Sequence, residues 1–170
     1  MSPLLWLSLG LWAVALGVGA LDGLYFHLWK FRLFAHAQSR MEHLTHTVRA
    51  CLLGPILWLA FVAPRLDLLV ALVAIDTAVV LIDVWLETES RRALGGIPRA
   101  EYVVHVVANT LHTAAMTLAM AVWWVSPSAQ VPGLVHGMAE ALAASTVPVA
   151  VLHVLLALWT PARFRGARAV

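Results

Sequence analysis

Residues 74–87, AIDTAVVLIDVWLE, have the apolar character of a membrane helix and yet carry Asp76, Asp83 and Glu87. The three acids follow one another at spacings of seven and four residues. At about 100° per residue of an α-helix, they fall within roughly 40° of one another. This stretch therefore predicts a membrane helix with a line of carboxylates along one face.

The composition of the whole chain agrees with a membrane helix. Hydrophobic residues make up 62% of the 170 residues, charged residues make up 12%, and the mean hydropathy is +0.86. Apolar runs that reach the length of about 20 residues needed to cross a bilayer can be drawn at 4–27, 41–63, 68–88, 101–125 and 138–160. With short linkers between them, these runs predict an all-α membrane protein. We expect one polytopic domain over residues 1–170, an antiparallel bundle of five transmembrane helices.

Basic residues near the helix ends predict the orientation, because cytoplasmic loops are enriched in Lys and Arg. Ten of them fall on one side: Lys30, Arg32, Arg40 and Arg49 near the first connection, Arg91, Arg92 and Arg99 near the third, and Arg163, Arg165 and Arg168 at the C-terminus. Arg65 stands alone on the other side. The N-terminus is expected outside and the C-terminus in the cytoplasm, as in a multi-pass protein of a bacterial-type inner (plasma) membrane.

Several function classes are disfavoured at once. The arginines are spread over short segments with no basic soluble element, which argues against nucleic-acid binding. Cys51 is the only cysteine, so the chain has neither an internal disulfide nor a paired-thiol site. Soluble catalytic signatures such as HExxH, GxSxG or a phosphate-binding glycine loop are missing.

Polar residues recur inside the other apolar runs as well. Helix 101–125 carries Glu101, His105 and His112 within about 100° of arc. In helix 41–63, Glu42, His46 and Arg49 share a face, with His43 about 60° from His46. Asp22 and His27 in the first helix are separated by about 140°, so one of them is expected to point away from the bundle axis. Ser39 and Glu42 also fit a helix-capping box.

These groups suggest a metal centre. An ionised side chain at the middle of a bilayer costs about 2.5–3.5 kcal/mol, so several of them must neutralise one another or bind a cation. Carboxylates and imidazoles from facing helices are the ligands of bundle metal sites. The predicted metal ligands are His43, His46, Asp83, Glu87, His105, His112, Asp22 and His153. Counted from the inner helix ends, Asp22, Asp76, Arg49, His112 and His153 should lie about 10 Å deeper than the others.

We expect a membrane metalloenzyme with two divalent ions, iron in the first instance, that oxidises a lipid-soluble substrate taken from the bilayer. An electron donor or a membrane-complex partner would then be required. Asp76 or Glu87 would act as a base or bridging ligand, and Arg49 would hold an anionic headgroup or a ligand carboxylate, or pair with Asp76. Zinc, which generates hydroxide for hydrolysis, is the alternative metal. Met116 and Met120 are expected to pack in the core.

Haem b is an alternative cofactor, with histidines such as His46 and His105 as axial ligands. RLFAHA and MEHLTHTVRACLLGP resemble the end of the first helix and the second helix of small membrane protoporphyrinogen oxidases that bind haem b. The resemblance does not extend further, because the first helix has no early histidine and the third carries acids, so no residue roles are carried over. Conduction of a metal ion or proton and a non-catalytic subunit of a membrane complex are the remaining alternatives.

Overall fold

The computed structural model describes residues 2–159, and these form helices with no strand. The five long helices are α1 (Ser2–Ala20), α2 (Arg40–Leu57), α3 (Leu66–Arg91), α4 (Arg99–Val125) and α5 (Gly133–Leu158). Shorter helical segments extend or connect them: η1 (Leu21–Lys30), η2 (Leu33–Ala35), η3 (Trp58–Val62) and η4 (Arg92–Leu94). All five spans are long and apolar enough to cross a membrane, as the sequence predicts.

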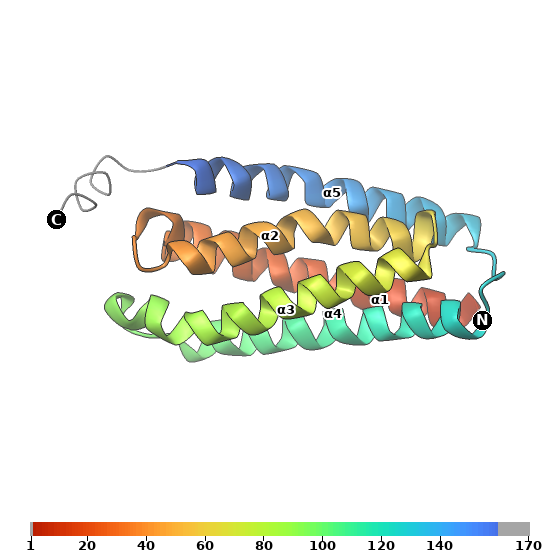
Figure 1. Ribbon diagram of the computed structural model, residues 1–170, viewed down its shortest axis with the longest axis horizontal. Helices are drawn as coiled ribbons and strands as arrows, with labels where there is room; N and C mark the ends of the chain where they lie inside the picture. The colour runs from red at the N-terminus through yellow and green to blue at the C-terminus, as the bar shows by residue number, and fades with distance from the viewer. Residues whose placement is uncertain (1, 160–170) are drawn as a thin grey trace.

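Consecutive long helices run in opposite directions along one bundle axis (Figure 1). α1 packs mainly on α4, and α2 packs on both α3 and α5. The connections through η2 and η4 lie at the same end of the bundle, where α1 with η1 ends and α4 begins (Figure 1). Polar residues near that end of each helix are thus brought to a common level.

Helix bounds depart from the expected ones mainly at the fifth span. This helix begins at Gly133, after the N-cap residue Pro132, and not at residue 138. Proline has a fixed backbone geometry that suits the start of a helix. The helix therefore begins directly after Pro132, several residues earlier than the apolar run predicts. His136, expected in a loop, therefore lies in α5, while His36 follows η2 as expected. Arg163, Arg165, Arg168 and the predicted last residue of this span, 160, lie outside the described residues.

The first span continues from α1 into η1, a π-helix of ten residues. A π-helix has i→i+5 hydrogen bonds, and Phe31 N–H donates to Phe26 O at 2.9 Å in this pattern. Residues five apart therefore lie nearly above one another, and Asp22 and His27 are both buried. The expectation that one of them points away is wrong, because it assumed α-helical periodicity throughout the span.

The half of the bundle remote from η2 and η4 has an apolar core. Its buried side chains come from four or more helices and include Leu9, Ile56, Phe61, Leu69 and Met116. Met120 packs against the same core, so both methionines have the packing role expected of them. The residues of this core are all apolar, so apolar packing holds the helices together there.

One glycine permits a close helix contact in this core. A Cβ on Gly54 would lie 2.8 Å from Thr146 Oγ1, so a side chain there would force α2 away from α5. The predicted break after the third span is also a glycine feature, since Gly95 and Gly96 have φ values of 92° and 85°. That left-handed conformation favours glycine.

Candidate metal centre

The acidic face of α3 points into the bundle. Asp76, Asp83 and Glu87 are 2%, 1% and 7% exposed, which confirms that they share one buried face. The Asp83 carboxylate lies between two imidazoles, with Oδ2 3.3 Å from His46 Nε2 and 3.5 Å from His105 Nε2. Its Oδ1 accepts a hydrogen bond from the Thr45 hydroxyl, which orients the carboxylate.

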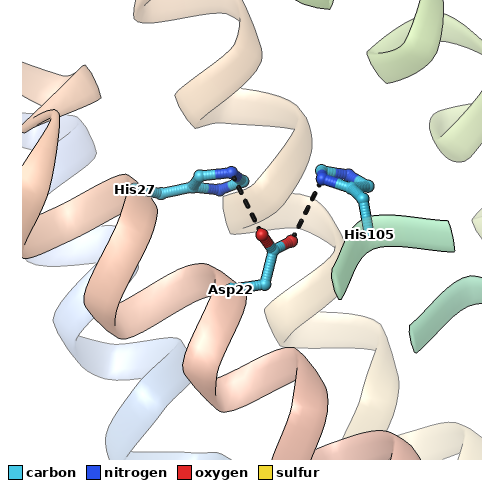
Figure 2. Close-up of side chains that lie close together, drawn as sticks. All are labelled: Asp22, His27 and His105. Atoms are coloured by element: carbon cyan, nitrogen blue, oxygen red, sulfur yellow. Dashed lines mark ion pairs between the residues drawn. The ribbon is translucent and has the colours of Figure 1, made fainter. Parts of the chain in front are cut away.

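Asp22 of η1 lies between His105 and a further imidazole, that of His27 (Figure 2). Its Oδ2 is 3.2 Å from His105 Nδ1, and its Oδ1 is 3.6 Å from His27 Nε2. Figure 2 shows the carboxylate directed toward both rings. Asp22 and His27 both belong to η1. Asp22 therefore belongs to the level of His105 and not to the deeper layer that counting α-helical residues predicts.

Three overlapping sets of ligand atoms result. They are Asp22–His27–His105, His27–Glu42–His46 and His46–Asp83–His105, and within each set the atoms lie within 4.8 Å of one another. Each histidine belongs to two sets. We call these six residues the ligand cluster; they come from η1, α2, α3 and α4. The structure thus offers three imidazoles and three carboxylates to bound metal.

The ring nitrogens of the ligand cluster lack hydrogen-bond partners among residues 2–159. Both nitrogens of His27 and His105, and Nε2 of His46, are buried without one. They approach carboxylate oxygens, but not in the alignment that an N–H donor requires. Buried polar atoms are nearly always satisfied in native proteins. Nitrogens of His43, His112 and His153 share this state outside the cluster, so it is the approach of several carboxylates to the cluster nitrogens that makes the cluster residues the candidate metal ligands.

A buried arginine that the sequence analysis placed at the membrane interface lies beside the cluster. Arg91 is fully buried, with Nε 3.0 Å from Glu42 Oε1 and its Nη2 bonded to Glu101. Ser90 Oγ also donates to Glu42. The capping-box prediction is wrong, since Glu42 serves this network and Ser39 Oγ donates to Ser90 O. Arg91 follows Glu87 by four residues, so extending the acidic face by one turn would have found it.

Arg49, Asp76 and His112 form a separate group, which we call the triad. Arg49 Nε is 3.2 Å from Asp76 Oδ1, and His112 Nε2 is 3.0 Å from Asp76 Oδ2. The alternative that Arg49 pairs with Asp76 is confirmed, and Arg49 is not an interfacial base. His112 belongs to none of the three ligand sets. Its imidazole contacts Asp76 because α4 carries it two turns deeper than His105.

The remaining predicted ligands lie at the edge of the cluster. His43 and His153 stack on each other, with ring centroids 5.4 Å apart, and belong to none of the three ligand sets. His43 and His46 thus do not share a ligand set, and His46 turns toward His27, with ring centroids 4.1 Å apart. Glu87 Oε1 is 3.6 Å from His105 Nδ1, within reach as an additional ligand. His27, Glu42 and Glu101 are site residues missing from the predicted set.

Two cavities adjoin these groups. The larger, about 180 Å³, is lined by residues of α1, η1, α2, α4 and α5, among them Asp22, His46 and His105. The smaller, about 80 Å³, adjoins Asp76 and Met116. Arg49 and His112 line both cavities, so the triad lies between them.

The charges of the buried groups do not balance. Six carboxylates are buried, those of Asp22, Glu42, Asp76, Asp83, Glu87 and Glu101. Arg91 and the partly buried Arg49 supply two positive charges. With neutral histidines, six negative and two positive groups leave a formal charge of four minus. Two divalent cations would neutralise it.

Comparisons of the chain with protein-family models, curated proteins and solved structures found no match. The chain has five helices that are long and apolar enough to cross a membrane, consistent with a multi-pass membrane protein. Its buried histidine–carboxylate groups could hold a metal ion.

Proposed function

We propose that this chain is a membrane-embedded metalloenzyme in which the ligand cluster binds two divalent transition-metal ions, iron in the first instance. The supporting observation is the excess of buried carboxylates, six against two arginines among residues 2–159, beside histidine nitrogens without hydrogen-bond partners. Burying uncompensated charge in a low-dielectric interior costs many kcal/mol. Metal binding recovers that cost and engages the same nitrogen atoms.

The donor atoms fit iron, manganese or zinc. Imidazole and carboxylate suit these ions, whereas the soft ligands of copper(I) are missing from the cluster. Cys51 is exposed and Met116 lies in the apolar core. Each set offers three protein ligands to one ion and would leave positions for substrate or oxygen, and any two sets together offer five residues because they share a histidine.

The reaction we propose is the oxidation of an unactivated C–H bond in a lipid-soluble substrate. In balanced form, R–H, O₂, two electrons and two protons give R–OH and H₂O. The electrons come from a separate reductant, so an electron-donor protein or a membrane-complex partner belongs to the proposal. Bound iron supplies oxygen activation, and the chain holds the ligands, excludes water and supplies protons.

Individual side chains then have distinct roles. Thr45 orients Asp83 between His46 and His105, and Glu87 lies close enough to His105 to bind metal or accept a proton. Arg91 holds Glu42 and Glu101 at the edge of the cluster. Asp76 is engaged with Arg49 and His112, so we assign it to the triad and no longer to the metal.

The orientation remains part of the proposal. Lys30, Arg32 and Arg40 lie at the bundle end nearer the cluster, and exposed Arg92 lies there too. The positive-inside rule would place that end, and the substrate entrance, toward the cytoplasm of a bacterial-type plasma membrane. Accessibility of single cysteines introduced at Arg92 and at Ser128, which lies in the connection to α5, tests it: a membrane-impermeant reagent should reach only position 128 in intact cells.

Two alternatives are less compatible with the geometry. A porphyrin between His46 and His105 would need the space that the Asp83 carboxylate fills. A conduction path would have to cross the core around Leu9, Phe61 and Met116, which are at most 1% exposed. The geometry favours a site reached from one end over a pore.

Elemental analysis of protein purified without added metal tests the proposal. We expect transition metal bound in a fixed ratio and released by a strong chelator with loss of thermal stability. A preparation with no transition metal, and with stability unchanged by chelation, would exclude the metalloenzyme.

A further inference from the structure

We propose that the larger cavity is the substrate site and that it takes an uncharged, chain-shaped aliphatic molecule lying parallel to the helices. This inference rests on the proposed function for its chemistry, but its geometry is independent of metal. The cavity measures about 180 Å³, and Asp22, His46 and His105 of the ligand cluster are among the residues that line it. We call it the slot.

The slot is elongated along the bundle. On the first span its lining runs from Trp12 to Leu24, which corresponds to roughly 18 Å at 1.5 Å per residue. On α4 the lining runs from His105 to His112, roughly 10 Å by the same measure. One end therefore meets Asp22 and His105 of the ligand cluster, and the other ends at Trp12 and His112. An extended aliphatic chain matches this shape, with its terminal carbon at the cluster.

The wall of the slot between these ends is mostly apolar. Leu16 and Ala20 line it from α1, Leu53 from α2, Ala108 from α4 and Val149 from α5. The neutral polar groups Asn109, Ser145 and Thr146 interrupt this wall. Apolar pockets with a few polar groups are typical of small-molecule sites, and here the polar ends fix which end of a chain approaches the cluster.

The charges argue for an uncharged molecule. Arg49 is the one Lys or Arg among the lining residues described, and Asp76 already neutralises it at 3.2 Å. In the metal-free protein, Asp22 at the other end would repel a carboxylate or phosphate. A fatty acid or phospholipid headgroup would then meet only the imidazoles of His46, His105, His112 and His153 as possible cations, whereas a hydrocarbon or an alcohol needs none.

Two glycines of α1 provide a matched pair of variants. A Cβ on Gly19 or on Gly17 would meet no atom within 4 Å, so neither backbone is strained by a side chain. Gly19 lines the slot, and Gly17 does not. Gly19→Phe is thus expected to fill the slot and Gly17→Phe to leave it open, and Gly19→Leu provides a smaller block if the larger one disturbs insertion.

Trp12 provides the readout, because it lines the far end of the slot and is otherwise buried. We would titrate detergent-purified protein with 10-bromodecan-1-ol, whose bromine quenches nearby tryptophan. The difference between the protein and its Trp12→Phe variant isolates the Trp12 signal. We expect saturable Trp12 quenching, lost or weakened at least tenfold in Gly19→Phe and retained in Gly17→Phe. After treatment with chelator, 10-bromodecanoate should bind at least tenfold more weakly than the alcohol.

Metal content measured on the same preparations separates the two proposals. Trp12 quenching without bound metal would support the slot and exclude the metalloenzyme. Bound metal without saturable Trp12 quenching would overturn the slot and leave the metal centre standing. Equal quenching in Gly19→Phe and the unmodified protein, or equal binding of the carboxylate after chelation, would also overturn this inference.

Discussion

The ligand cluster and the triad both bring histidine to buried carboxylates, but they differ in the balance of acidic and basic groups. In the triad, the Asp76 carboxylate has one partner for each oxygen, Arg49 at 3.2 Å and His112 at 3.0 Å. In the cluster, His105 faces three carboxylates at 3.2–3.6 Å, and both of its ring nitrogens lack a hydrogen-bond partner. The triad pairs its carboxylate with an arginine, whereas His105 faces three carboxylates, and we propose that bound metal neutralises this excess of acidic groups.

The largest effect is expected from replacing His105, which belongs to two ligand sets. His105→Ala should reduce bound metal to background, since even residues that only support metal ligands cost about 10–100-fold in affinity when removed. Elemental analysis of the purified variant measures this. His136→Ala is the control, because His136 is 40% exposed and pairs with Glu140 near the start of α5. Equal metal in both variants would show that the cluster is not the binding site.

Replacing Arg91 tests whether its positive charge stabilises Glu42 and Glu101 at the edge of the cluster. Arg91→Met leaves Glu42 and Glu101 without their guanidinium, and breaking a buried ion pair costs about 3–5 kcal/mol of unfolding free energy. Unfolding in mixed detergent micelles measures the loss. The neighbouring Arg92→Met should stay within about 1 kcal/mol of the unmodified protein, because the Arg92 side chain is 73% exposed. Similar losses from both variants would contradict the assigned role of Arg91.

Disrupting the triad should affect stability without affecting metal. Arg49→Met and Asp76→Leu each leave a charge unpaired and should each lower the free energy of unfolding by about 3 kcal/mol. The double variant should lose less than the sum of the two, because it removes both charges at once. Metal content should stay unchanged in all three. Loss of metal from the Asp76→Leu variant would show that Asp76 is a metal ligand.

The smallest effect is expected for the stacked pair of His43 and His153. His153→Ala removes an aromatic contact worth about 0.5–1.5 kcal/mol and should leave the metal stoichiometry unchanged. Thermal unfolding and elemental analysis of one preparation measure both quantities. If metal were lost, His153 would be a ligand, as the sequence predicts, and the three ligand sets would be incomplete.

Much of this fold could be predicted because hydropathy and helical period act locally. The spacing of Asp76, Asp83 and Glu87 gives the correct buried face of α3, since nothing interrupts α-helical geometry there. The same rule fails for Asp22 and His27, where a π-helix changes the residues per turn. The ten consecutive residues from Leu21 to Lys30 have an apolar and polar pattern from which we could not distinguish a π-helix from an α-helix.

Partner choice in the site could not be predicted from helical faces. Glu42 has the position of a capping residue, yet its partners Ser90 and Arg91 come from the far end of α3. His112 shares a face of α4 with His105, but it lies two turns deeper and therefore contacts Asp76. A face fixes the direction of a side chain around the helix axis, and only the relative shift of neighbouring helices fixes its partner.

The most direct test of the central claim is the metal stoichiometry of the purified chain together with its response to chelation. The account predicts two divalent transition-metal ions per chain, matching the formal charge of four minus on the buried groups, and a lower unfolding temperature after their removal. A chain that contains no transition metal and unfolds at the same temperature with and without chelator would show that the buried acids are neutralised by protons, and would contradict it.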